Sequence, residues 1–141
     1  AISQLGDNDQ HILCYVDLDY FKDVNDTAGH EAGDMVLRMV AQTMQQAVRE
    51  NDIVARLGGD EFAIVLFNCQ NKPATDILES VVADIAAIQF HWHGQSYTFT
   101  ASLGAVPLTR QTENAAQSMR QADIACYAAK HAGRNRLSLS L

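Results

Sequence analysis

Two pairs of acidic residues have the types and spacing of a metal-binding site. Asp17 and Asp19 end an apolar, β-rich segment, and Asp60 and Glu61 follow two glycines at the turn of an expected hairpin. Alternate residues of a strand point to one face, so Asp17 and Asp19 share a face if the strand persists. Carboxylates from neighbouring strand ends can hold Mg²⁺, which prefers oxygen ligands and often shares them with phosphates. For each pair taken alone, solvated strand-end or turn acids are the simpler alternative.

Three cations could contact phosphate groups. Lys22 follows Asp19 within a turn and could contact phosphate as a point charge, although a solvated surface lysine is the alternative. Lys130 and Arg134 lie on either side of an expected helix end, where cations also favour the helix dipole. The sequence alone does not separate the two explanations for this second pair.

Asn25 and Asp34 could recognise a guanine base. A carboxylate accepts hydrogen bonds from the N1–H and N2–H₂ edge of guanine, and an amide can both donate and accept there. Adenine lacks that paired donor edge. For Asp34 alone, we favour the simpler explanation that an acid stabilises the N-terminal part of a helix.

Alternating strands and helices are expected to position these residues. Gly58 and Gly59 supply the positive φ that a tight hairpin turn requires. The order predicts an α+β fold, an α/β sandwich whose central mixed, largely antiparallel sheet is flanked by helices. Apolar periodicity predicts strands over 11–19, 53–57, 62–67 and 136–141, two strands within 88–108 joined near Gly94, helices over 31–49, 73–88 and 112–131, and a loop or short helix over 20–30.

Composition bounds the class of protein. The 141 residues fit one domain, 1–141, and 48% hydrophobic residues allow a sizeable core. A net charge of −7 disfavours a nucleic-acid partner, which would normally bind a basic face. The three dispersed cysteines and the lack of an apolar run of about 20 residues suggest a cytoplasmic chain. Since the chain does not begin with methionine, we expect it to be a piece of a longer protein, which leaves open a membrane anchor elsewhere.

Three ordered blocks of the sequence resemble the GGDEF family of diguanylate cyclases. Residues 58–62, GGDEF, match the family signature, and residues 17–34, DLDYFKDVNDTAGHEAGD, are similar to its pattern D-x-D-x-F-K-x-x-N-D-x-x-G-H-x-x-G-D. Residues 122–136 are similar to its closing helix and strand. The resemblance implies a fold like nucleotide-cyclase and polymerase-palm domains. It also implies that two GTP molecules are joined into cyclic di-GMP with release of two pyrophosphates.

The resemblance also implies a role for each candidate residue. Asp17, the Leu18 carbonyl and Asp60 would hold Mg²⁺ or Mn²⁺, and Asp60 or Glu61 would help to deprotonate the attacking 3′-hydroxyl. The remaining contacts to GTP would come from Lys22, Lys130 and Arg134 at the triphosphate, from Asn25 and Asp34 at guanine with His30 nearby, and from Gly58 and Gly59, which leave room for the nucleotide.

Arg49 and Asp52 resemble the inhibitory R-x-x-D site of the family, which binds the product. A helix-end arginine followed by a turn aspartate is the alternative. Because the product is two-fold symmetric and one domain offers one GTP site, catalysis is expected to need a homodimer.

Two other functions are alternatives to this one. A catalytically silent domain that binds GTP or cyclic di-GMP would have no need of the intact acids. A cyclase acting on one ATP is disfavoured by Asn25 and Asp34. The closing segment is similar to domains that precede a phosphodiesterase domain, so the parent protein is expected to carry further sensory or phosphodiesterase domains.

Overall fold

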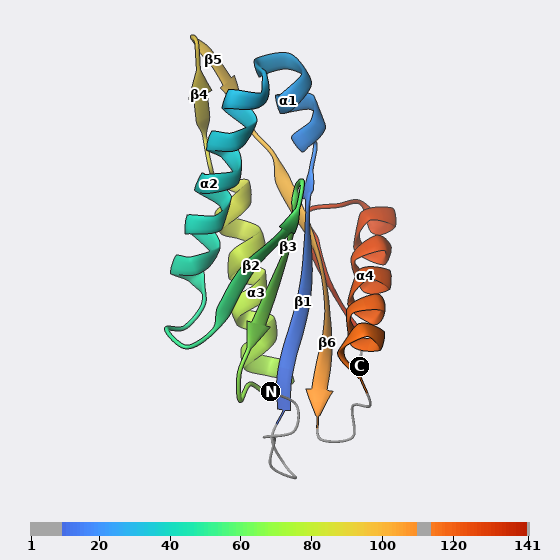
Figure 1. Cartoon of the computed structure of the whole chain (residues 1–141). Helices are drawn as coiled ribbons and strands as arrows, with labels where there is room; N and C mark the ends of the chain where they lie inside the picture. Colours follow the sequence, from blue (N-terminus) through green and yellow to red (C-terminus); the bar gives the residue numbers. More distant parts are fainter. Residues whose placement is uncertain (1–9, 110–113, 141) are drawn as a thin grey trace.

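A five-stranded sheet forms the centre of the molecule, with strands in the order β2-β3-β1-β6-β7, and a separate two-stranded sheet pairs β4 with β5 (Figure 1). The computed structural model describes residues 10–109 and 114–140. The elements are, in chain order, β1 (Gln10–Asp19), α1 (Phe21–Ala28), α2 (His30–Ala47), β2 (Ile53–Gly58), β3 (Glu61–Leu66), α3 (Asn71–Ala86), β4 (Phe90–Trp92), β5 (Gln95–Tyr97), β6 (Thr100–Thr109), α4 (Ala115–Ala132) and β7 (Arg136–Leu139).

The central strand, β1, pairs antiparallel with β3 on one side and with β6 on the other. Its even-numbered residues from Ile12 to Leu18 face one side of the sheet, and its odd-numbered residues from Leu13 to Asp19 face the other. β7 pairs parallel with β6, which makes the sheet mixed. The predicted α+β fold with a mixed, largely antiparallel sheet flanked by helices is therefore confirmed.

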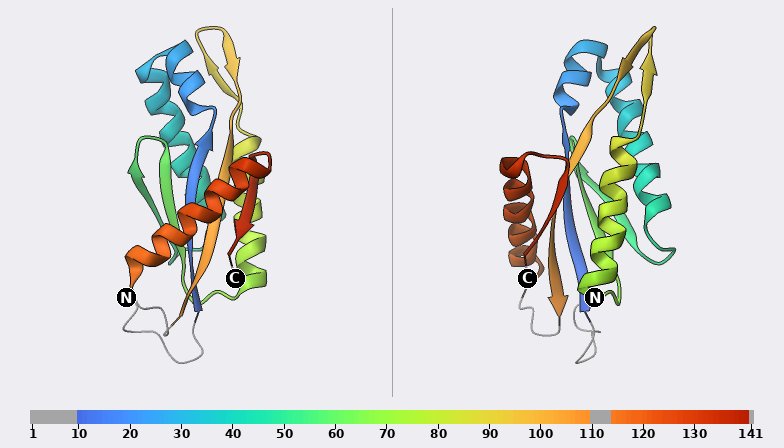
Figure 2. Two further views of the ribbon diagram at one scale, coloured as in Figure 1. Left: turned by 90° about the vertical axis from the view of Figure 1, so that its right-hand side faces the viewer. Right: turned by 180° about the vertical axis from the view of Figure 1, so that it is seen from behind.

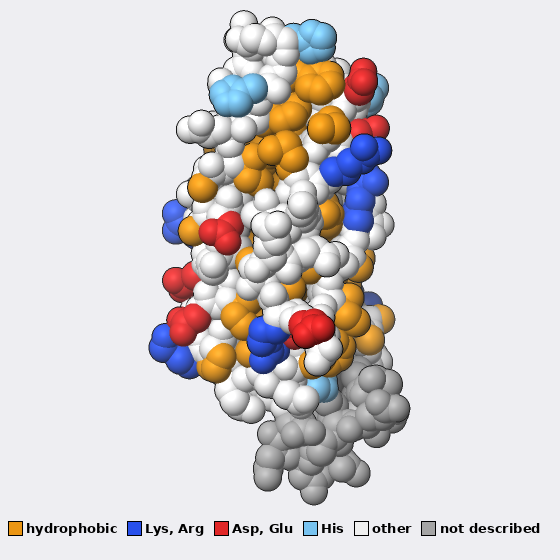
Figure 3. Space-filling view, turned by 90° about the vertical axis from the view of Figure 1, so that its left-hand side faces the viewer, with side chains coloured by type: hydrophobic (Ala, Val, Ile, Leu, Met, Phe, Trp, Pro, Cys, Tyr) orange, Lys and Arg blue, Asp and Glu red, His pale blue; other side chains and the backbone are white. Residues whose placement is uncertain are grey.

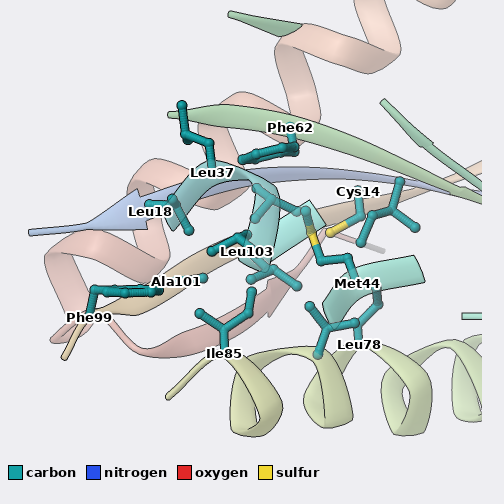
Figure 4. Packing of buried hydrophobic residues seen from close by; sticks show 14 of the residues in the cluster. Cys14, Leu18, Leu37, Met44, Phe62, Leu78, Ile85, Phe99, Ala101 and Leu103 are labelled. Carbon is teal, nitrogen blue, oxygen red and sulfur yellow. The ribbon is translucent and has the colours of Figure 1, made fainter. Parts of the chain in front are cut away.

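The main hydrophobic core lies on the even-numbered side of β1, beneath α2 and α3. Leu37 and Met44 of α2 and Leu78 of α3 recur at helical spacing and pack toward the strands (Figure 4). Phe62 follows the hairpin acids directly and is only 1% exposed. Full burial of such a side chain contributes roughly 1.5–3 kcal/mol. Phe62 therefore anchors the hairpin tip against the core.

The opposite face of the sheet is covered by α4, which contacts β6, β1 and β7 (Figure 2). A Cβ atom added at Gly104 of β6 would overlap the backbone of Cys126 and Ala122, so the helix backbone lies directly on the strand. The Asn114 side chain caps the helix start by accepting from the Gln117 amide at 2.6 Å. This close packing brings the last turn of α4, with Lys130, to the end of β1.

Two segments differ from or refine the predictions. Residues 20–30, expected as a loop or short helix, contain the short helix α1. The expectation of two strands within 88–108 is wrong, because three strands form there. The turn at Gly94, with a φ of 80°, joins β4 and β5, and β6 is a separate long strand of the central sheet. The predicted helix start at Thr112 lies outside the described residues.

The three cysteines are all free and buried under different parts of the structure. Cys14 belongs to the core beneath α2 and α3, and Cys69 follows β3. Cys126 lies on the buried face of α4 and donates from its Sγ to the Ser102 carbonyl at 3.2 Å. Among helices in the part of the chain that is described, none is both long and apolar enough to cross a membrane.

Candidate active site

The two predicted acid pairs meet at one end of the sheet. Asp17 of β1 lies opposite Glu61 of β3 in the strand register, and the Leu18 amide donates to the Asp60 carbonyl at 3.2 Å. Gly59, with a φ of 49°, forms the turn, and the Arg56 Nε donates to its carbonyl at 3.0 Å. The hairpin therefore holds Asp60 and Glu61 against the end of β1, as the sequence predicts.

Asp17, Asp60 and Glu61 form an acid cluster whose carboxylates are difficult to ionise together. Burial, with a smaller contribution from the negative charges of Asp60 and Glu61, raises the pKa of Asp17 to about 6 despite the opposing charge of Lys130. Burial also raises the pKa of Asp60, with a contribution from Glu61. The net result is a concentration of negative charge that the protein alone compensates only in part, and a bound cation would relieve it.

The predicted metal ligands fit a divalent cation by their chemistry. Asp17, the Leu18 carbonyl and Asp60 offer only oxygen atoms, which Mg²⁺ and Mn²⁺ prefer. Within residues 10–109 and 114–140, no three His, Cys, Asp or Glu side chains form a complete metal cage. A site made of two carboxylates and a carbonyl leaves coordination positions for substrate phosphates, as is usual for Mg²⁺.

Lys130 bridges the two acids of β1. Its Nζ lies 2.9 Å from Asp19 Oδ1 and 3.7 Å from Asp17 Oδ2. Burial lowers the pKa of Lys130, but the hydrogen bond to Asp19 and the charge of Asp17 outweigh it, so the pKa is raised. Burial alone would raise the pKa of Asp19, but hydrogen bonds from Thr100, Lys130 and Ser102 hold it below its usual value. Lys130 is therefore a firmly protonated cation beside the acid cluster.

The candidate guanine-binding residues lie on α1 and α2. The Asn25 Nδ2 and His30 Nδ1 are 3.2 Å apart, so the imidazole can orient the amide. A Cβ atom at Gly33 would overlap Asn25 Oδ1, so glycine admits this amide against α2. Asp34 is exposed and lines a cavity of about 380 Å³ between α2 and the hairpin, which also involves Leu37. Figure 3 views the molecule from the α2 side, where charged and hydrophobic side chains are interspersed.

The other candidate phosphate contacts are more exposed. Lys22 lies exposed in the first turn of α1. Arg134, with a φ of 63°, follows α4; its guanidinium lies 5.7 Å from the centre of the Tyr20 ring, and its Nε lies 4.0 Å from Asp19 Oδ1. Lys130 and Arg134 line one small cavity of about 280 Å³ with Tyr127 and His131. Added Cβ atoms at Gly58 and Gly59 would meet no atom within 4 Å, so both glycines border open space.

The candidate inhibitory pair lies at the other end of the hairpin, before β2. Asp52, whose side chain is 2% exposed, accepts from the Arg49 amide, the Arg49 guanidinium and the Phe67 amide. Burial alone would raise the pKa of Asp52, but the bonds from Arg49 and Phe67 lower it. The Arg49 side chain is 45% exposed. Asp52 therefore ties the loop together, and Arg49 is the accessible member of the pair.

The sequence matches a known family over almost its whole length. A family model described as "Diguanylate cyclase, GGDEF domain" matches residues 1–136. The chain belongs to the GGDEF domain family. Its curated relatives include probable diguanylate cyclase DgcE of Escherichia coli K12, 42% identical over 92% of this chain and 12% of that protein. Cyclic di-GMP phosphodiesterase PdeB of Shewanella oneidensis is 35% identical over 90% of this chain and 15% of that protein.

Solved GGDEF domains share the fold. The structure of diguanylate cyclase SiaD of Pseudomonas aeruginosa, in complex with its activator SiaC, is similar with a TM-score of 0.89 and 33% identity, covering 94% of this chain and 50% of that one. The GGDEF domain of DgcB from Caulobacter crescentus, in complex with c-di-GMP, gives a TM-score of 0.86 and 30% identity, covering 93% and 78%. This GGDEF domain spans less than a fifth of the length of the curated relatives just named.

The roles of two residues of the GGDEF domain, Asp19 and Gly33, were not predicted from the sequence. Asp19 was a candidate metal ligand by its spacing, but its side chain is 0% exposed and saturated with hydrogen bonds. Gly33 precedes Asp34 and shapes the position of Asn25. A glycine inside a helical pattern is a known sign of close packing and could have drawn attention to Gly33. No sequence signal identifies the partners of Asp19.

Proposed function

We propose that this GGDEF domain is a diguanylate cyclase, which condenses two GTP molecules into cyclic di-GMP and releases two pyrophosphates. The observation that supports this most strongly is the meeting of Asp17, Asp60 and Glu61 at adjacent strand ends beside Lys130. Positioning and electrostatic stabilisation do most of the work in phosphoryl transfer. The acid cluster and its neighbouring cation offer both signs of charge for that work.

In each half of the proposed reaction, the 3′-hydroxyl oxygen of one GTP attacks the α-phosphorus of the other. A new P–O bond forms as the bond to the pyrophosphate oxygen breaks, and the hydroxyl proton passes to a carboxylate of the hairpin tip. Asp60 and Glu61 are the candidate bases. Burial raises the pKa of Asp60, which makes it a better proton acceptor than an ordinary aspartate. Lys22, Lys130 and Arg134 offset the charge of the triphosphate and of the departing pyrophosphate.

The remaining candidates bind and orient the substrate in this proposal. Asn25 and Asp34 hydrogen-bond the guanine edge, His30 fixes the Asn25 amide, and Gly58 and Gly59 allow the nucleotide to approach the backbone. Asp17, the Leu18 carbonyl and Asp60 would hold Mg²⁺ or Mn²⁺, which would supply positive charge to the phosphates and lower the pKa of the attacking hydroxyl. A homodimer brings two GTP-loaded domains face to face, because each domain supplies one site.

The first experiment incubates the purified chain with GTP and Mg²⁺ and separates the products by chromatography. Cyclic di-GMP and two pyrophosphates per product are expected, with a rate that rises faster than linearly with protein concentration. Asp60→Ala is expected to lower the rate by roughly 10²-fold or more, because it removes a ligand and a candidate base. Asp76→Ala is the matched control, since Asp76 is an exposed acid on α3. Absence of product from the unaltered chain at all protein concentrations would overturn the proposal.

We also propose that cyclic di-GMP inhibits the domain by binding at the site of Arg49 and Asp52, where Arg49 contacts the product and Asp52 holds the loop. The exposed guanidinium of Arg49 supports this, because an arginine fork can bind phosphate or a guanine edge. Arg49→Ala is expected to keep the initial rate and to relieve inhibition by added product. Lys72→Ala, which removes an exposed cation on α3, is the control. Unchanged inhibition in Arg49→Ala would remove Arg49 from the product site.

A catalytically silent GTP- or cyclic di-GMP-binding domain is the second candidate. The similarity to PdeB, which is named as a phosphodiesterase, favours it. A silent domain would bind a GTP analogue without forming cyclic di-GMP at any protein concentration. It would act on a neighbouring sensory or phosphodiesterase domain of the parent protein.

A further inference from the structure

Asp19 is the most completely bonded side chain at the end of β1. Its Oδ2 accepts from Thr100 Oγ1 at 2.7 Å and from the Asn135 amide at 3.1 Å. Its Oδ1 accepts from Ser102 Oγ at 2.8 Å and from Lys130 Nζ at 2.9 Å. One buried carboxylate thus joins β1 to β6, to the last turn of α4 and to the turn before β7.

These hydrogen bonds leave Asp19 no capacity for a metal ion. A carboxylate offers about four lone-pair sites. Each Asp19 oxygen already takes two donors, and the side chain is 0% exposed. Asp17, its neighbour on the same face, is 23% exposed, and among the described residues its cation partner is Lys130, at 3.7 Å. The two acids of the D-x-D pattern therefore have different roles.

The turn after α4 depends on Asp19. Gly133, Arg134 and Asn135 have φ values of 132°, 63° and 50°, so three successive residues lie in the left-handed region. Such a conformation costs on the order of 1 kcal/mol for each non-glycine residue and persists where other contacts hold it. The bond from the Asn135 amide to Asp19 is such a contact, and it places Arg134 beside the end of β1.

Asp19 also sets the distance between Lys130 and the acid cluster. Lys130 is closer to Asp19, at 2.9 Å, than to the partly exposed Asp17, at 3.7 Å, so Asp19 holds the ammonium in the shorter of its two contacts. If Asp19 lost its charge, Lys130 would pair with Asp17, the other acid within reach among the described residues. A cation would then compete with Lys130 for Asp17.

We propose that Asp19 is a positioning residue, which places Lys130 and Arg134 for the triphosphate and keeps Asp17 free for a cation. This inference rests on the proposed function, because it concerns the same GTP site. It assigns Asp19 no contact with substrate or metal. Its effect on GTP binding passes through Lys130 and through the turn that carries Arg134.

The test measures the binding of a GTP analogue with a methylene group between the α- and β-phosphates, by titration calorimetry with Mg²⁺. Calorimetry separates the dissociation constant from the fraction of folded protein, so a loss of folded protein alone leaves the constant unchanged. Asp19→Asn keeps the shape of the side chain and is expected to weaken binding by about 10-fold or more and to raise the Mg²⁺ concentration needed for half-saturation. Ser102→Ala removes a donor to Asp19 that belongs neither to Lys130 nor to the turn, and is expected to bind within about twofold of the unaltered chain.

A double-mutant cycle with Lys130→Met tests whether the effect of Asp19 on GTP binding passes through Lys130. The loss from Asp19→Asn is expected to be smaller in the Lys130→Met background but to remain at least about threefold, because the turn is still released. An equal loss in both backgrounds would overturn the role of Lys130. If Asp19→Asn alone does not fold, the double variant Asp19→Asn/Lys130→Met is used instead, because it removes both charges of the pair. Its dissociation constant for the GTP analogue is compared with that of Lys130→Met. Equal dissociation constants would overturn the inference.

Two further outcomes separate this inference from the proposed function. An unaltered chain that bound no GTP analogue would overturn the proposed function and this inference with it. An unaltered chain that bound the analogue and made cyclic di-GMP, with Asp19→Asn equal to it in affinity and Mg²⁺ dependence, would overturn this inference alone.

Discussion

Replacement of Asp52 by asparagine is expected to destabilise the fold through the loop before β2. Oδ1 accepts from the Arg49 guanidinium and the Phe67 amide, and Oδ2 accepts from the Arg49 amide and Nε. Either orientation of an asparagine amide would turn its NH₂ toward two of these donors. Arg49 can move into solvent, but a backbone N–H would stay unpaired. An unpaired buried donor costs about 1–3 kcal/mol and lost charge-assisted bonds add to it, so we expect a loss of roughly 2–4 kcal/mol.

Urea unfolding provides the assay. With a slope of about 2 kcal/mol per molar urea, in the middle of the usual range for small proteins, the midpoint is expected to fall by roughly 1–2 M at pH 7. Because the folded-state pKa of Asp52 is lowered, its contribution is present above the ordinary value of 3.8 and is lost as pH falls through the folded value. The difference between the two proteins should therefore shrink below pH 3.8.

Arg49→Ala is the matched control for this measurement, because it keeps both backbone donors paired with Asp52. Its expected cost is smaller, about 1–2 kcal/mol, because Asp52 keeps two backbone donors and loses only the guanidinium, which also donates to the Phe67 carbonyl. Equal stability of Asp52→Asn and the unaltered chain at pH 7, or an equal loss in Arg49→Ala, would refute the assignment of Asp52 as the residue that ties this loop.

Three further predictions follow from close contacts and clustered charge. Since the pKa of Asp17 is raised to about 6, this carboxyl destabilises the metal-free protein as pH rises from 3.8 toward 6. Asp17→Asn should then be more stable by roughly 1–2 kcal/mol at pH 8 in EDTA, after allowance for partial exposure, and not at pH 3.8; a less stable variant at both pH values would contradict this. Gly104→Ala should displace α4 at a cost of about 1–3 kcal/mol, seen as a lower Tm, and an unchanged Tm would show that the helix accommodates the methyl group. Gly33→Ala should push the Asn25 amide aside and raise the KM for GTP by about 10-fold, measured by steady-state kinetics, whereas an unchanged KM would remove Asn25 from base recognition.

Local patterns predicted much of the fold. The hairpin could be predicted because Gly58 and Gly59 mark a turn between two short apolar strands. The apolar run before Asp17 and the helical period after Glu31 likewise have lengths and spacings typical of one element. The segment 88–108 was harder, since Thr98 and Phe99 are good strand-forming residues and give no sign of the break between β5 and β6.

The acid cluster was predictable for a different reason from the fold. Asp17 and the hairpin acids are each marked by their own strand end, so their meeting required only that the two strands be neighbours. The role of Asp19 depends on partners 81, 83, 111 and 116 residues away. Packing of β6 and α4 creates those contacts, and no local pattern around Asp19 encodes them. The parallel pairing of β7 with β6 could not be predicted from the sequence either, because a strand with alternating residues can pair in either direction.

The three buried thiols give the natural chain a set of internal reporters. Burial raises the pKa of Cys126 to about 12 and also raises that of Cys14 and Cys69, so each thiol is protonated and protected while its cover is in place. Alkylation of Cys126 would time the detachment of α4, alkylation of Cys69 the loosening of the segment after β3, and alkylation of Cys14 the opening of the main core. Peptide mass spectrometry after a pulse of alkylating reagent would thus follow three separate opening events in one protein, without any introduced probe.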